Sequence, residues 1–205
     1  MRLIHALLGS LAGVVLAAAP VFAAERYHEV ADPKPTEAET PIVVEEFFWF
    51  GCPSCYQFEP HLEAWLADLP EDVTFVRVAP ALNPGWEPLA RAHYAAEMLE
   101  VGDEIHGALF EAIHARGFRP ESAEQLADFY AGQGVDREQF LQMYNSFAVM
   151  TSVRRANSRA QQLGIRGVPS MVVNGTYRVD VKEAGGHAGM IDVTEQLIET
   201  LREGD

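Results

Sequence analysis

The sequence contains only two cysteines, Cys52 and Cys55, and they are separated by two residues. No cysteine is available for a disulfide between distant segments, the kind that most reduces the entropy of the unfolded chain. A structural zinc site needs four ligands, and the sequence has neither a second cysteine pair nor a His-x-x-x-His or His-Glu-x-x-His pattern. Besides zinc binding, the cysteines could be an inert buried pair or could carry out reversible thiol chemistry. The close spacing of Cys52 and Cys55 favours reversible thiol chemistry.

Positive charge is also scarce. The chain has 15 Lys and Arg residues against 30 Asp and Glu residues, a net charge of −15. A surface this acidic repels a phosphate backbone, so the composition argues against nucleic acid as a partner.

One long apolar run is present, and it lies at the N-terminus. Arg2 precedes an apolar stretch from Leu3 to Ala19, and small residues lead up to Ala23. This pattern predicts a signal peptide over residues 1–23, and therefore export to the periplasm; an uncleaved membrane anchor is the alternative. The remaining 182 residues suit one domain, or one domain with a large insertion.

The spacing of apolar residues predicts strands near both ends of the exported chain and helices between them. The predicted strands are Tyr27–Ala31, Ile42–Phe50, Val73–Val78, Ser170–Val173 and Thr176–Val179, the last two joined by Asn174-Gly175 in a type I′ turn. Helices are predicted from Cys52, throughout residues 87–161, and at the end of the chain. We therefore expect an α/β domain formed by residues 24–86 and 162–205, interrupted by an all-helical insertion at 87–161.

The two cysteines lie where a strand passes into a helix. Pro53 fits the first helical turn, so Cys52 is expected at the helix N-terminus, where free N–H groups and the helix dipole stabilise a thiolate. Cys55 lies three residues later on the same helical face and is expected to be more buried. Cys52 would then exchange disulfides with a partner, and Cys55 would resolve the mixed disulfide.

Two segments resemble the DsbA family of thiol:disulfide interchange proteins. Residues 46–59, which read EFFWFGCPSCYQFE, resemble the active-site segment of that family. Residues 167–175, which read GVPSMVVNG, resemble its cis-proline loop and the hairpin that follows. The resemblance implies a thioredoxin-like fold with a helical insertion, and a redox centre made by Cys52 and Cys55 without an external cofactor or a metal.

The family resemblance also implies roles for other residues. Pro169 matches the cis-proline that faces the disulfide, and the backbone of Val168 would pair with an extended substrate. Glu46 resembles the buried acid that relays protons to the resolving cysteine, with Glu45 on the opposite face of the strand. Arg77 falls near the basic partner of this acid, although a surface Arg is an open alternative. The predicted substrate contacts are Val168, Pro53, Ser54 and Met171.

One residue departs from the family pattern. Family members commonly carry His at the position of Ser54, where its charge favours the thiolate.

We expect a dithiol oxidase that forms disulfides in exported proteins and is reoxidised by a membrane quinone reductase of the DsbB type, acting as a monomer. The alternatives are a disulfide reductase or isomerase of the same fold, and a chaperone module that binds peptides without redox turnover.

Overall fold

The structure is a computed structural model that describes residues 26–33 and 42–203. The predicted signal peptide, residues 1–23, lies outside these residues. Within them, no helix has both the length and the apolar character needed to cross a membrane.

A five-stranded mixed sheet forms the centre of the fold. Its spatial order is β1-β5-β4-β2-β3, with β2 parallel to β3 and every other neighbouring pair antiparallel. The strands are β1 (His28–Glu29), β2 (Ile42–Phe47), β3 (Val73–Val78), β4 (Ser170–Val173) and β5 (Tyr177–Asp180). Strand β2 ends three residues earlier than predicted, and residues 48–51 carry the chain from the sheet to the cysteines.

Helices cover the sheet and extend beyond it. They are α1 (Pro53–Leu66), the short 3₁₀ helix η1 (Pro84–Trp86), α2 (Glu87–Met98), α3 (Gly102–His114), α4 (Ala123–Gly132), α5 (Arg137–Tyr144), α6 (Phe147–Gln162), α7 (Val181–Ala184) and α8 (His187–Glu203). The single-turn helix α7 is absent from the sequence prediction. Its four residues are too few to show a helical repeat in the sequence.

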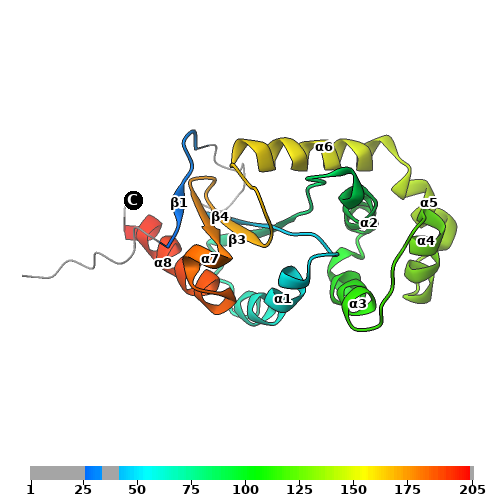
Figure 1. Ribbon diagram of the computed structural model, residues 1–205, viewed down its shortest axis with the longest axis horizontal. Helices are drawn as coiled ribbons and strands as arrows, with labels where there is room; N and C mark the ends of the chain where they lie inside the picture. Colours follow the sequence, from blue (N-terminus) through cyan, green and yellow to red (C-terminus); the bar gives the residue numbers. More distant parts are fainter. Residues whose placement is uncertain (1–25, 34–41, 204–205) are drawn as a thin grey trace, which may run out of the picture.

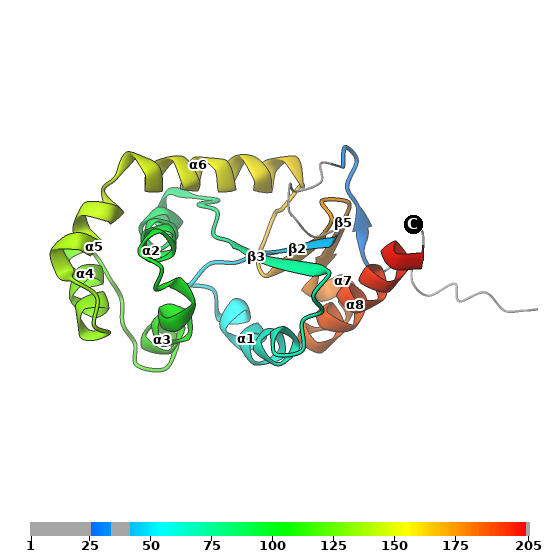
Figure 2. The ribbon, with the colours of Figure 1, turned by 180° about the vertical axis from the view of Figure 1, so that it is seen from behind.

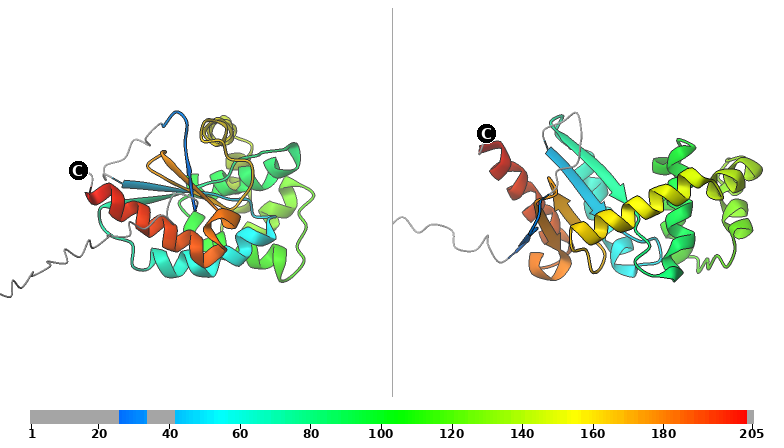
Figure 3. Two further views of the ribbon diagram at one scale, coloured as in Figure 1. Left: turned by 60° about the vertical axis from the view of Figure 1, so that its left-hand side comes forward. Right: turned by 90° about the horizontal axis from the view of Figure 1, so that it is seen from above.

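Different helices pack on the two faces of the sheet (Figures 1 and 3). Helices α1 and α8 pack on one face, where Phe58 and Leu62 of α1 meet Met190 and Leu197 of α8. Helix α6 packs on the other face through small side chains, Ala156 and Ala160. The fold is therefore a sheet between two helical layers, as expected for a thioredoxin-like α/β domain.

Helices α2–α5 form a lobe beside the sheet, and α6 runs back from this lobe across the sheet (Figures 1 and 2). The lobe has its own core, which includes Leu109, Leu126 and Phe140. Phe48 and Phe50, which follow β2, are buried in that same core. The segment that leads into the cysteines is therefore held between the sheet and the helical lobe.

Short-range interactions begin three of the helices and form the turn between β4 and β5. Ser122, Asp136 and Ser146 each cap a helix by accepting a hydrogen bond from the backbone N–H three residues later. The predicted turn at Asn174-Gly175 is present, with φ of +50° and +63° at the two residues. These side chains act within a few residues of themselves, so the signals that they carry are local in the sequence.

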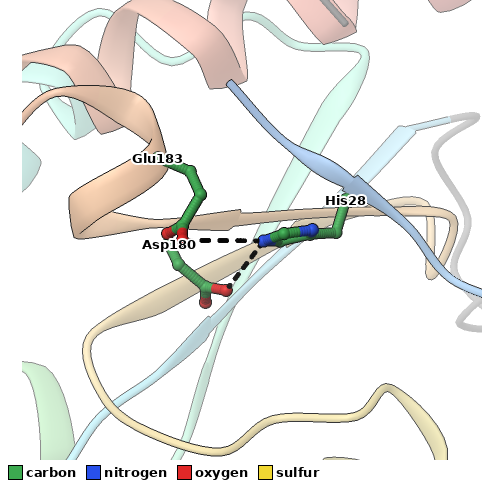
Figure 4. Close-up of side chains that lie close together, drawn as sticks. All are labelled: His28, Asp180 and Glu183. Carbon is green, nitrogen blue, oxygen red and sulfur yellow. Dashed lines mark ion pairs between the residues drawn. The ribbon is translucent and has the colours of Figure 1, made fainter. Parts of the chain in front are cut away.

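The edge strand β1 is attached to β5 and α7 by a small ionic cluster (Figure 4). His28 Nε2 lies 3.8 Å from Asp180 Oδ2 and 4.0 Å from Glu183 Oε1. These three residues are the one group of potential metal ligands within reach of one another in the described part of the chain. Arg178 Nε donates to the same Asp180 oxygen at 2.9 Å, so a cation there would compete with a guanidinium.

Candidate active site

Cys52 is the N-cap of α1. Its sulfur accepts a hydrogen bond from the backbone N–H of Cys55 at 3.4 Å, as an N-cap side chain does. Pro53 occupies the first turn, where its missing N–H removes no helical hydrogen bond. Cys52 is partly exposed and Cys55 is buried, and both thiols are free. The structure therefore corresponds to the reduced dithiol, with one sulfur accessible and the other covered.

The pKa values of the two thiols are shifted in opposite directions. Hydrogen bonds from Cys55 and from the backbone N–H groups of Cys55 and Ser54 lower the pKa of Cys52 to about 6, against partial burial that raises it. Burial raises the pKa of Cys55 far above its usual value, and the neighbouring Cys52 and Glu46 add to this effect. Near neutral pH, Cys52 is therefore a thiolate and Cys55 is a thiol.

The loop before β4 lies against the accessible sulfur. The peptide bond between Val168 and Pro169 is cis, as the family resemblance implied. The Cys52 sulfur lies 3.4 Å from the carbonyl oxygen of Val168, to which its protonated form donates a hydrogen bond. Pro169 is buried and Val168 is partly exposed. Two segments that are more than a hundred residues apart thus meet at the sulfur.

Gly51 allows an indole ring to pack beside the motif. A Cβ atom at Gly51 would lie 2.3 Å from Cζ2 of Trp49, so no larger residue fits without moving this ring. Trp49 in turn stacks on Trp86, with ring centroids 4.6 Å apart and planes 4° from parallel. Trp49, Gly51, Pro53 and His114 are among the residues that line a cavity of about 310 Å³ beside the active site.

Glu45 and Glu46 are both buried, on opposite faces of β2, because side chains alternate along a strand. Glu45 forms an ion pair with Arg159 of α6 at 2.5 Å. Glu46 lies on the α1 side with no hydrogen-bond partner for either carboxylate oxygen. Burial, reinforced by Glu59, raises the pKa of Glu46 well above its usual range, against the opposing effect of Arg77. Glu46 is therefore the buried acid on the Cys55 side of the strand, and its raised pKa favours the protonated form.

Arg77 of β3 connects Glu46 to the protein surface. Its Nε lies 3.7 Å from Glu46 Oε2, so Arg77 is the basic partner of Glu46 and not a plain surface residue. Its guanidinium also reaches Glu59 at 3.8 Å and the exposed carboxylates of Glu63 at 2.6 Å and Asp103 at 3.5 Å. A chain of ionisable groups thus runs from below Cys55 to the groove between α1 and α3.

Glu59 and His106 form a buried pair in this network that the sequence did not indicate. Their closest atoms, Glu59 Oε1 and His106 Nε2, are 3.3 Å apart. Burial raises the pKa of Glu59 to about 7 and lowers the pKa of His106 to about 3, so the imidazole is neutral. Glu59 lies four residues after Cys55 on α1, so helical spacing is the one sequence feature that could have placed it near the site. His106 comes from the helical lobe, and no feature of the sequence placed it there.

The predicted substrate contacts fall into two groups. Pro53 is exposed, and Ser54 and Val168 are partly exposed. Pro53 and Ser54 follow Cys52 in the first turn of α1, and the Val168 carbonyl oxygen lies 3.4 Å from the Cys52 sulfur. Met171 is fully buried and packs in the core beneath α1 and α8. Alternation along β4 turns this side chain inward. Met171 is therefore not available to line a substrate groove, and that prediction is corrected.

Comparison with known proteins agrees with this site. A family model described as "DSBA-like thioredoxin domain" matches residues 71–192. The chain is 41% identical over 196 residues to the thiol:disulfide interchange protein DsbA of Pseudomonas aeruginosa, an alignment that covers 95% of this chain and 92% of the relative. It is 42% identical over 188 residues to the DsbA of Azotobacter vinelandii, with 91% and 87% covered.

Solved structures give the same result. The crystal structure of Pseudomonas aeruginosa DsbA superposes with a TM-score of 0.84 at 40% identity, covering 88% of this chain and 94% of that one. The oxidoreductase DsbA from Xylella fastidiosa superposes with a TM-score of 0.82 at 34% identity, covering 87% and 96%. The chain belongs to the DsbA family of thiol:disulfide oxidoreductases, which have a thioredoxin-like fold.

Proposed function

We propose that this protein is a dithiol oxidase that introduces disulfides into exported proteins in the periplasm. The observation that carries this proposal is the unequal acidity of the two thiols. A thiol with a pKa of about 6 at Cys52 favours the reduced, thiolate-bearing form of the enzyme. A protein whose reduced form is stabilised releases its disulfide readily to other thiols, which is the property of an oxidant.

The proposed reaction has two exchange steps. A substrate thiolate attacks the sulfur of Cys52 in the Cys52–Cys55 disulfide, which forms a mixed disulfide and releases the sulfur of Cys55. A second substrate thiolate then attacks the substrate sulfur of the mixed disulfide and releases Cys52 as a thiolate. The substrate loses two electrons and gains a disulfide, and the enzyme gains two electrons.

Glu46 supplies the proton that the first step requires. The released sulfur of Cys55 is buried and holds a proton strongly, so it must receive one as it leaves. Glu46 has a raised pKa and lies close enough to Cys55 to interact with it electrostatically, which suits Glu46 to be the donor. Arg77 and the Glu59–His106 pair extend from Glu46 toward the α1–α3 groove, where the proton is replaced from solvent.

The substrate binds as an extended strand beside Cys52. The backbone of Val168 offers main-chain groups next to the sulfur, as strand addition requires. Pro169 shapes this loop, and Pro53 and Ser54 border the exposed side of the motif. The redox centre is the dithiol itself, so no external cofactor or metal is proposed.

The remaining parts of the proposal rest on the family resemblance and on the sequence. They are export directed by residues 1–23, a monomeric state, and reoxidation by a DsbB-like membrane quinone reductase. Nucleic acid is not proposed as a partner, because the chain carries a net charge of −15.

Equilibration of the Cys52–Cys55 pair against glutathione buffers tests the proposal. We expect a reduction potential clearly more oxidising than about −200 mV, together with rapid disulfide formation in a reduced, unfolded test protein. A potential near about −270 mV, the thioredoxin range, would favour the reductase alternative instead. The chaperone alternative predicts that Cys52→Ala retains full activity, whereas the oxidase loses all of it.

A further inference from the structure

Ser54, inside the cysteine motif, is hydrogen-bonded to a residue from the far end of the chain. Its Oγ lies 2.9 Å from Nε2 of His187, although the two residues are 133 positions apart. His187 is the first residue of α8, and it follows Gly185 and Gly186, whose φ angles are +86° and +116°. This left-handed link, which glycine adopts readily, turns the chain between α7 and α8 and brings the imidazole to α1.

We propose that His187 is a positioning residue which acts through Ser54 to stabilise the Cys52 thiolate and couples that thiolate to the protonation of an imidazole. This inference rests on the proposed redox function of Cys52. It adds a residue that lies outside the cysteine segment, residues 46–59, and outside the cis-proline segment, residues 167–175.

The first step of the argument is the position of the Ser54 backbone. The N–H of Ser54 is one of the groups that lower the pKa of Cys52. The hydrogen bond to His187 fixes the Ser54 side chain, and with it the first turn of α1, against α8. A fixed N–H stabilises an anion better than a mobile one, because it needs no reorganisation when the charge forms.

The second step concerns charge. When His187 is protonated, it places a cation 2.9 Å from the hydroxyl of Ser54, two residues after Cys52, and a nearby cation stabilises an anion. By linkage, the same interaction makes the thiolate raise the pKa of His187. The imidazole should therefore bind its proton more tightly in the reduced enzyme than in the oxidised enzyme, where the sulfur is neutral.

The surroundings of His187 leave Cys52 as the source of a redox-dependent shift. Burial and His61 lower the pKa of His187, and the two rings are 6.3 Å apart. Phe58 of α1 packs at 5.9 Å, and the N-terminus of α8 adds positive potential. None of the ion pairs among residues 26–33 and 42–203 includes His187. These groups are the same in both redox states, whereas the charge on Cys52 is not.

The test has two readouts on the complete protein. The pKa of Cys52 is measured by thiolate absorbance in the wild type, His187→Ala, His187→Asn and the control His61→Ala, which removes a neighbouring imidazole but leaves Ser54 and its partner in place. The pKa of His187 is measured by NMR in the reduced and oxidised wild type, which needs no variant to fold.

We expect His187→Ala to raise the pKa of Cys52 by about half a unit, roughly a threefold loss in the thiolate-to-thiol ratio. His187→Asn, which retains a hydrogen-bonding side chain, should recover part of this loss, and His61→Ala should not raise the pKa of Cys52. The pKa of His187 should be higher in the reduced wild type than in the oxidised wild type.

The inference is overturned if His187 titrates identically in both redox states, or if His187→Ala leaves the pKa of Cys52 unchanged. Failure of the proposed function has a different signature. In that case the pKa of Cys52 in the wild type is itself near 9, its ordinary value, whatever residue occupies position 187.

Discussion

The sulfur of Cys52 lies 3.4 Å from the carbonyl oxygen of Val168, to which the protonated thiol donates a hydrogen bond. The two residues are 116 positions apart, and the contact joins the N-terminus of α1 to the cis-proline loop. It places the reactive sulfur beside the backbone group with which an extended substrate would pair. The following predictions test the chemistry and the scaffold of this site.

Substitution of the cysteines should separate their two roles. Cys52→Ala is expected to abolish disulfide exchange, since it removes the accessible thiolate. Cys55→Ala cannot form the Cys52–Cys55 disulfide, but its Cys52 thiolate should attack a substrate disulfide and accumulate a mixed disulfide, because no thiol at position 55 can release it. Mass spectrometry of trapped complexes checks this, and equal trapping by both variants would contradict the assignment. Thiolate absorbance should show one transition, at about pH 6, which Cys52→Ala removes.

The reduced enzyme should gain stability relative to the oxidised enzyme as the pH rises from about 6 to 9. The folded state lowers the pKa of Cys52 from 9.0 to about 6, so this contribution is full above pH 9 and is lost as the pH falls through 6. At pH 7 we expect about 1 kcal/mol, after allowance for solvent screening of the half-exposed sulfur. Urea unfolding of both redox forms at pH 5, 7 and 8.5 measures the gap.

A gap that does not change with pH would contradict a stabilised thiolate. The Cys52→Ala, Cys55→Ala double variant provides the control, because its stability should show no contribution from a thiolate in this range.

Glu46→Gln should slow the enzyme without destabilising it. The pKa of Glu46 is raised in the folded state, so the native carboxyl favours folding below its ordinary pKa of 4.5 and loses this contribution as the pH rises. A neutral Gln avoids that loss, and we expect equal or greater stability at pH 8, by about 1–2 kcal/mol. Exchange should slow by about tenfold or more, because Cys55 loses its proton donor.

Stopped-flow kinetics and urea unfolding measure the two effects of Glu46→Gln. The matched control is Glu45→Gln, on the opposite face of β2, which should leave the exchange rate unchanged. Equal slowing by both variants would remove Glu46 from the proposed proton path.

Arg159→Ala should destabilise the fold without changing the redox chemistry. This variant leaves the buried carboxylate of Glu45 without its guanidinium partner, and loss of one member of a buried pair costs about 3 kcal/mol. The pKa of Cys52 should stay near 6, because α6 packs on the face of the sheet opposite α1. Arg155→Ala, at an exposed position of the same helix, should have little effect on urea unfolding.

Gly51→Ala should disturb the indole pair beside the active site. The added methyl would lie 2.3 Å from the Trp49 ring, so this ring must leave its stack on Trp86. We expect a loss of about 1–3 kcal/mol and a changed near-UV circular dichroism spectrum. Gly107→Ala, where nothing lies within 4 Å of the new Cβ, should instead stabilise helix α3 slightly. An unchanged spectrum for Gly51→Ala would contradict the packing.

Features that act over a few residues could be predicted from the sequence. Cys52 and Cys55 are three positions apart at a strand-to-helix junction, and the helix N-terminus itself favours the thiolate of the first cysteine. The same holds for the turn at Asn174-Gly175. The family resemblance added the cis bond before Pro169, which local propensity alone does not predict.

Only the tertiary structure decided which distant side chains meet at the site. It buried Met171, paired Arg77 with Glu46, and brought His106 and His187 to α1 from two other helices. These contacts depend on how the sheet, the helical lobe and α8 pack together. Such packing is determined by the whole core and leaves no periodic or local signal in the sequence.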